Sequence, residues 1–233
     1  MKYILISLMT FFFSNTLLSQ DEVESNDWVL GGSFSFSSQN GYIPFLGLLP
    51  RPVGGGIFSS SSYDVTYKTL SFNPYFGKQL NKNALLGVSF IVSSIQTDRE
   101  GLGLSGSGET FQFESQDKWL GFGIFYRQSK SLVQDLSIYV EPYANYNFGN
   151  GSTSVDSEET GTEDSQFFKL GVSAGFMYQF GSKLRATLNV AALEYINGSW
   201  ESDDGFETES ADFNSFGMRT NLSSIRLGFE ILF

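Results

Sequence analysis

Residues Gln166–Phe180 read QFFKLGVSAGFMYQF, and the character of the side chain changes at every step of this stretch. One set of alternate positions is apolar, and the other is mostly small, polar or charged. The apolar set is Phe168, Leu170, Val172, Ala174, Phe176 and Tyr178, and the other set is Lys169, Gly171, Ser173, Gly175, Met177 and Gln179. Only an extended strand places alternate residues on opposite faces. The stretch therefore predicts a β-strand with one apolar and one polar face.

The same alternation recurs along the chain and predicts eight strands. They are Trp28–Ser37, Tyr63–Leu80, Ala84–Ser94, Lys118–Gln128, Leu136–Phe148, Gln166–Phe180, Leu184–Ile196 and Ser215–Phe233. The links alternate between short turns, at 81–83, 129–135 and 181–183, and long links, at 39–62, 95–117, 149–165 and 197–214. This alternation indicates antiparallel hairpins whose turns share one end of the sheet. An even strand number with both termini at that end permits closure into an up-and-down barrel.

The composition indicates whether the apolar face of the barrel is its exterior, as in a membrane protein, or its interior, as in a soluble protein. Charged residues make up 17% of the 233 residues and aromatic residues 16%, whereas soluble domains carry about 25% charged residues. The polar positions are rich in Gly, Ser and Asn, which suits a narrow lumen better than a solvated surface. A soluble barrel with an apolar interior is the alternative. The apolar positions suit an exterior that faces lipid, because a tilted strand of about ten residues spans a lipid belt about 25 Å high. We therefore predict an all-β, closed antiparallel up-and-down transmembrane β-barrel of eight strands.

The first nineteen residues are predicted to lie outside the fold. Met1–Lys2 gives a positive start, and an apolar run to Leu18 ends before the acidic residues of 21–27. This pattern is typical of a cleaved secretory signal peptide, residues 1–19, which leaves a barrel domain of residues 20–233. An uncleaved anchor helix is the alternative, but the run is shorter than the roughly 20 residues that a spanning helix needs.

The chain contains no His and no Cys. This excludes Ser-His-Asp triads, cysteine nucleophiles, His or Cys zinc sites and disulfides. Only a carboxylate pair is left for catalysis, and the adjacent acids Glu158–Glu159 and Asp203–Asp204 lie in segments that nothing in the sequence makes rigid. We therefore expect no catalytic residues, no cofactor and no enzyme.

Two segments of the sequence resemble a known family. The C-terminal run SIRLGFEILF, residues 224–233, resembles the signal by which outer-membrane barrels are handed to the barrel assembly machinery. The segment 70–87, LSFNPYFGKQLNKNALLG, is similar to the second hairpin of the small outer-membrane β-barrel family of Gram-negative bacteria, the eight-stranded, porin-like group that includes the barrels of outer-membrane proteins X and A. The resemblance implies a location in the outer membrane of the cell envelope, with lipid and lipopolysaccharide as neighbours. The expected assembly signal is Ile225, Leu227, Phe229, Ile231 and Phe233.

Acidic residues concentrate in two long links. The segments 149–165 and 200–213 contain five and six acids and no base, which together equal the whole net charge of −11. We expect these acidic loops to face outside, with Lys78, Lys82, Lys130 and Lys183 near the periplasmic turns. Nucleic acid is disfavoured as a partner because like charges repel phosphate. We expect solvated loops that their charge keeps soluble, without a metal site. The alternative is a Ca²⁺ or Mg²⁺ site, with Asp156, Glu158, Glu159, Asp203 and Asp204 as the candidate ligands.

Isolated charges at polar positions of the strands are expected to face the lumen. They are Glu141, Lys169, Arg185, Arg226 and Glu230. Unpaired burial of a charge is costly, so these residues predict a salt-bridge network that plugs the lumen. A selective small pore is the alternative.

The first long link contains an unusually apolar stretch, GYIPFLGLLPRPVGGGIF, residues 41–58. An external loop of this kind should cover the barrel mouth, lean on the membrane or contact a partner. The residues proposed for an external contact are Ile43, Phe45, Leu48, Leu49, Ile57 and Phe58. The sequence thus predicts a structural or surface-interaction barrel; a narrow pore or transporter for small solutes is the alternative.

Overall fold

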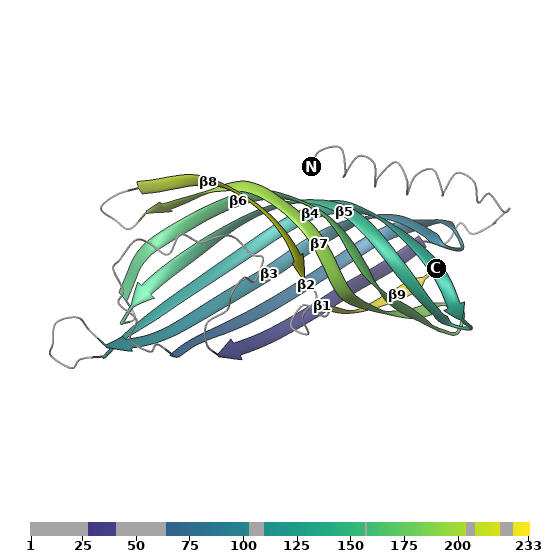
Figure 1. The fold of residues 1–233 in the computed structure, drawn as a ribbon, viewed down its shortest axis with the longest axis horizontal. Coiled ribbons are helices and arrows are strands. Elements are labelled where there is room, and N and C mark those ends of the chain that lie inside the picture. The colour runs from purple at the N-terminus through teal and green to yellow at the C-terminus, as the bar shows by residue number, and fades with distance from the viewer. Residues whose placement is uncertain (1–27, 41–63, 103–109, 157, 204–207, 220–225) are drawn as a thin grey trace.

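The computed structural model describes residues 28–40, 64–102, 110–156, 158–203, 208–219 and 226–233, and every regular element in them is a strand. The nine strands run obliquely around an elongated barrel (Figure 1). They are β1 (Trp28–Asn40), β2 (Asp64–Asn81), β3 (Ala84–Leu102), β4 (Thr110–Val133), β5 (Leu136–Val155), β6 (Glu158–Phe180), β7 (Leu184–Asp203), β8 (Thr208–Arg219) and β9 (Arg226–Leu232). The described residues include no helix long and apolar enough to cross a membrane.

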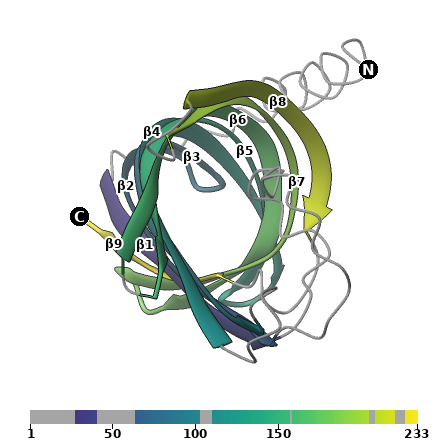
Figure 2. The same cartoon turned by 90° about the vertical axis from the view of Figure 1, so that its left-hand side faces the viewer.

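The strands form a closed ring of antiparallel pairs. Strands β1 to β7 pair in chain order, and β9 pairs with both β7 and β1. Two backbone hydrogen bonds between Trp28 and Phe233, of 2.9 and 3.0 Å, join the last residue of the chain to the start of β1. Figure 2 shows the ring from the end opposite these residues. The prediction of a closed antiparallel up-and-down barrel is confirmed.

The predicted eighth strand, Ser215–Phe233, consists of two segments. Both β8 and β9 pair with β7, β9 along its first half and β8 along its second half. Opposite the break between them, β7 has a register shift relative to β6 near Gly175. The ring closed through β9 is therefore eight strands wide. Beyond β9, β8 takes the place next to β7, and among the described residues β8 pairs with β7 alone.

The apolar positions lie on the outside of the barrel. On β4, Leu120, Phe122 and Ile124 are 51 to 61% exposed, while the intervening inward positions are Gly121 and Gly123, followed by the buried ring of Phe125. The same outward set continues around the ring through Leu30, Phe34, Leu70, Phe72, Leu86, Val88, Phe90, Phe148, Phe168, Phe176, Leu227 and Phe229. A soluble protein rarely exposes a continuous apolar surface of this extent, so the exterior is suited to lipid.

The strands extend well beyond the apolar belt at the end opposite the short turns. The segments 149–165 and 200–213, which the sequence predicts as acidic loops, are instead largely strand. Strand β5 continues to Val155 and β6 begins at Glu158, so that only 156–157 separates them; β7 continues to Asp203 and β8 begins at Thr208. The prediction of loops is wrong here because both faces of these extensions are polar. The extensions therefore lack the alternation of apolar and polar side chains by which a strand is recognised in the sequence, although their backbones remain paired.

Aromatic rings inside the barrel lie against glycines of the neighbouring strand. A Cβ atom on Gly87 would lie 2.6 Å from the Phe125 ring, and one on Gly171 would lie 2.5 Å from the Tyr143 ring. Gly175 has the same relation to Tyr139. In a narrow lumen a large ring has to lie across the adjacent strand, and only glycine leaves room for it. This explains why glycine recurs at inward positions.

We predict that Gly171→Ala lowers the free energy of unfolding by about 1–3 kcal/mol, because the three nearest atoms to the new methyl group all belong to the Tyr143 ring. The same substitution in a Tyr143→Leu background should cost much less, since the ring is gone. Urea unfolding in lipid vesicles measures both effects. Equal costs in the two backgrounds would contradict the packing argument.

Candidate functional site: the barrel lumen

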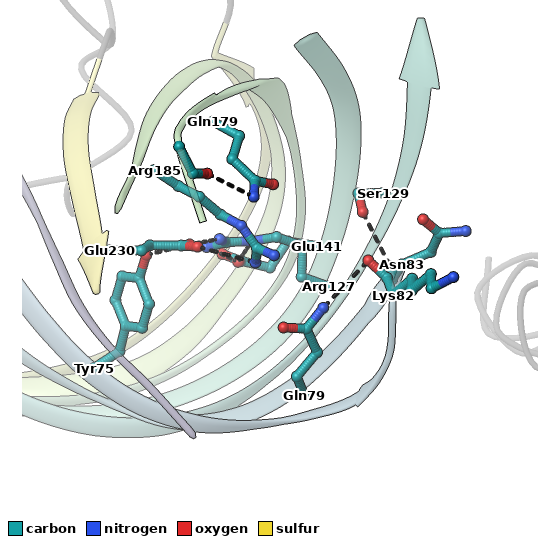
Figure 3. Close-up of polar contacts among 11 residues, drawn as sticks. Tyr75, Gln79, Lys82, Asn83, Arg127, Ser129, Glu141, Gln179, Arg185 and Glu230 are labelled. Carbon is teal, nitrogen blue, oxygen red and sulfur yellow. Dashed lines mark hydrogen bonds and ion pairs between the residues drawn. The ribbon is translucent and has the colours of Figure 1, made fainter. Parts of the chain in front are cut away.

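An arginine near the short-turn end is the centre of an ion-pair cluster in the lumen (Figure 3). Arg127 on β4 lies 2.7 Å through Nε and 2.6 Å through Nη2 from Glu141 Oε2 on β5. Its Nη1 also pairs with Glu230 on β9, and the Tyr75 hydroxyl on β2 donates to the same Glu230 oxygen at 2.6 Å. Strands β4 and β9 are not neighbours in the ring. The cluster therefore connects opposite parts of the wall across the lumen.

The cluster is balanced in charge and closely packed. Arg185 is the cross-strand partner of Glu230, and its Nη1 lies 3.8 Å from Glu230 Oε2. Two guanidinium groups thus face two carboxylates, and the Glu230 side chain is fully buried. The Arg127 guanidinium also lies over the Tyr139 ring, 4.7 Å from its centroid. Buried charges need partners of this kind because burial without them is costly.

Two further layers fill the lumen beyond this cluster. Lys169 Nζ lies 3.8 Å from Glu194 Oε1, and the Tyr143 hydroxyl donates to the same carboxylate. Farther from the short turns, an apolar cluster is formed by the buried side chains of Trp119, Phe167, Ile196 and Phe213. The lumen is thus occupied by side chains at three successive levels.

The lumen residues predicted from the sequence divide into three groups. Glu141, Arg185 and Glu230 meet around Arg127, whereas Lys169 pairs separately with Glu194. Arg226 lies beside Asn73, whose amide oxygen accepts from Nη1 at 3.1 Å when the amide is oriented to satisfy its neighbours.

Sequence reasoning missed Arg127, Glu194, Tyr75 and Tyr143. Arg127 is at an inward position of a correctly predicted strand, so its place in the alternation could have identified it.

The other candidate residues do not form a site among the described residues. The Asp156 carboxylate accepts a hydrogen bond from the Gln112 backbone N–H at 2.9 Å. Glu158 and Glu159 pair through the backbone with Val155 and Ser154, and Asp203 pairs with Thr162 and Thr208. In the described ranges, no group of three or more acidic side chains is arranged to hold a metal ion. Asp204 lies outside these ranges.

The terminal residues and the first long link are only partly described. Leu227, Phe229 and Ile231 point outward and are more than half exposed, and the Phe233 ring lies 6.4 Å from the Phe76 ring. Ile225 lies outside the described residues, as do Ile43, Phe45, Leu48, Leu49, Ile57 and Phe58, and the predicted signal peptide.

Solved structures of outer-membrane barrels are similar to this chain at low identity. OprG from Pseudomonas aeruginosa is 12% identical, with a TM-score of 0.46 over 90% of this chain and 96% of that chain. A major outer membrane protein from Thermus thermophilus is 16% identical, with a TM-score of 0.45 over 90% of this chain and 100% of that one. Ail from Yersinia pestis is 14% identical, with a TM-score of 0.40 over 91% and 100%. No protein-family model and no curated protein matches the chain.

The ring of paired strands and the apolar exterior define the class of protein. In a bilayer every backbone polar group has to be paired within the protein, and for strands this requires a closed ring. The protein is a transmembrane β-barrel.

We predict that Arg127→Met lowers the free energy of unfolding by about 3–5 kcal/mol, because it leaves Glu141 and the fully buried Glu230 without their main partner. The matched control is Lys68→Met, which removes an ion pair with Asp98 whose lysine is 47% exposed. That control should cost less than about 1 kcal/mol. Urea unfolding in vesicles measures both, and similar costs would show that the lumen cluster is not a stabilising centre.

Proposed function

We propose that the protein is a non-enzymatic outer-membrane barrel that acts through its external surface, while its lumen is closed to solutes. The observation that carries this proposal is the Arg127–Glu230 pair, which joins β4 to β9 across the lumen and buries Glu230 completely. Passage of a solute would require separation of this pair and of the two layers beyond it. The cost of exposing or unpairing those charges favours a plug.

The extended hairpins supply the surface for interaction. Asp164 on β6 is the cross-strand partner of Glu201 on β7, and both lie on the part of the sheet beyond the apolar belt. Carboxylates at this level could reach lipopolysaccharide through bridging divalent cations. In this proposal the short turns face the periplasm and the acidic hairpins face outside. The apolar segment 41–58, which lies outside the described residues, is the second proposed contact.

A narrow pore is the second candidate, and buried polar atoms in the wall support it. Asn145 Oδ1, Asn147 Nδ2 and Ser173 Oγ are buried and have no hydrogen-bond partner. Buried polar groups of this kind are usually satisfied by ordered water. Water between the ion-pair layers would support a path for very small solutes, but the pairs on either side still oppose larger ones.

Liposome swelling and planar-bilayer recording distinguish the two candidates. For the plugged barrel we expect no swelling with sugars and no unitary conductance. A variant that removes all three layers together, with Arg127, Glu230, Lys169, Glu194, Trp119 and Phe167 changed to Ala, should conduct ions, provided that it keeps heat-modifiable migration on a gel as proof of folding. Sugar uptake through the unmodified protein would contradict the proposal and favour the pore.

A further inference from the structure

Lysines gather at the short-turn end of the barrel. Lys78, Lys82, Lys130 and Lys183 are all exposed. Among the described residues, the exposed acid at this end is Asp135, in the turn between β4 and β5. Lys78, Lys82 and Lys130 share the sector formed by β2, β3 and β4, and we call these three residues the basic patch. The charge at this end is therefore opposite in sign to that of the acidic hairpins.

Two residues of the basic patch lie at the edge of the apolar belt. Lys78 occupies an outward position between Phe76 and Leu80, which are 38% and 49% exposed, and its Nζ lies 5.9 Å from the centroid of the Trp28 ring. Lys130 occupies an outward position on β4, two residues before the exposed Leu132. A lysine next to lipid-facing side chains extends its ammonium group to the level of the headgroups.

The third residue of the patch is held by an ordered turn. The Asn83 N–H donates to Asn81 Oδ1 at 2.9 Å, and Gln79 Nε2 donates to the Lys82 carbonyl at 3.3 Å. The Ser129 N–H donates to the Asn83 carbonyl at 2.7 Å, and the Ser129 hydroxyl donates to the same carbonyl at 3.1 Å (Figure 3). These bonds fix the turn to β4 one residue before Lys130. Since the backbone carrying Lys82 and Lys130 is already fixed, binding an anion there costs little ordering of the backbone.

We propose that the basic patch binds the phosphate headgroup of an anionic phospholipid in the periplasmic leaflet. The proposal rests on the proposed function for its orientation. Phosphate complements the three ammonium groups, and the exposed Phe76, Leu80 and Leu132 beside them complement the acyl chains. An acidic segment of this chain, residues 21–27, is the competing occupant. Lys78 and Lys130 occupy outward positions beside the apolar belt, which favours a lipid over the acidic segment as the occupant.

The test titrates a short-chain phosphatidylglycerol against the full protein in a zwitterionic detergent. The test variant is Lys78→Gln/Lys82→Gln/Lys130→Gln, and the matched control is Lys68→Gln/Lys118→Gln, which removes two exposed lysines toward the opposite end. We expect affinity to fall about 5-fold for each patch lysine removed, to weaken with added salt, and to be unchanged in the control. Phosphatidylcholine of the same chain length should bind weakly to all three proteins.

Four results would overturn the proposal. Three of them are equal affinities for the two lipids, equal affinities in the test variant and the control, and binding that develops only after the acids of 21–27 are changed to amides. Saturable binding of a soluble peptidoglycan fragment in place of the lipid would also overturn it. Heat-modifiable migration and insertion into pure phosphatidylcholine vesicles are measured in parallel. If these fail, the proposed function fails; if they hold while lipid selectivity is absent, only the basic patch is disproved.

Discussion

The pairing of the backbone within lipid is the constraint on which this structure depends. A strand in a bilayer cannot leave its N–H and C=O groups unpaired, so the last strand has to return to the first. Here β9 pairs with β1, and Trp28 and Phe233 are joined by backbone hydrogen bonds. Closure also separates the two faces of the sheet, so that one face meets lipid and the other lines the lumen. Because the ring is only eight strands wide, it also leaves a lumen that side chains can fill.

The narrow lumen accounts for the unusual interior. Large rings fit only where the neighbouring strand carries glycine, as with Tyr143 and Gly171. Charged groups are too close to the wall and to one another to remain solvated, so they pair, and Arg127 reaches carboxylates on two different strands. In the function proposed above, the same packing that stabilises the barrel also closes its lumen to solutes.

The sequence predicted the membrane-spanning part of the fold much better than the rest. Within the belt, apolar and small residues alternate, and that alternation identified β1 to β7, whereas it merged β8 and β9 into one predicted strand. Beyond the belt both faces meet water, so the strand extensions carrying Asp164 and Glu201 have no such signal and were predicted as loops. The charged residues of the lumen could be assigned to the inward face from the sequence. Which of them form ion pairs depends on the register of the strands and on distances across the ring. Arg127 is the clearest case, because its partner Glu230 is 103 residues away along the chain and lies on a strand that is not adjacent to β4.

The central claim, an apolar face in lipid and a filled lumen, is tested most directly by spin-label scanning along β4. The chain has no cysteine, so single cysteines can be introduced one at a time and labelled without background. In vesicles, labels at Leu120, Phe122 and Ile124 should be accessible to dissolved oxygen and protected from a water-soluble paramagnetic reagent. Labels at Trp119 and Phe125, whose side chains are buried in the lumen, should be poorly accessible to both, in folded variants. Access of the water-soluble reagent to the first set would contradict the account.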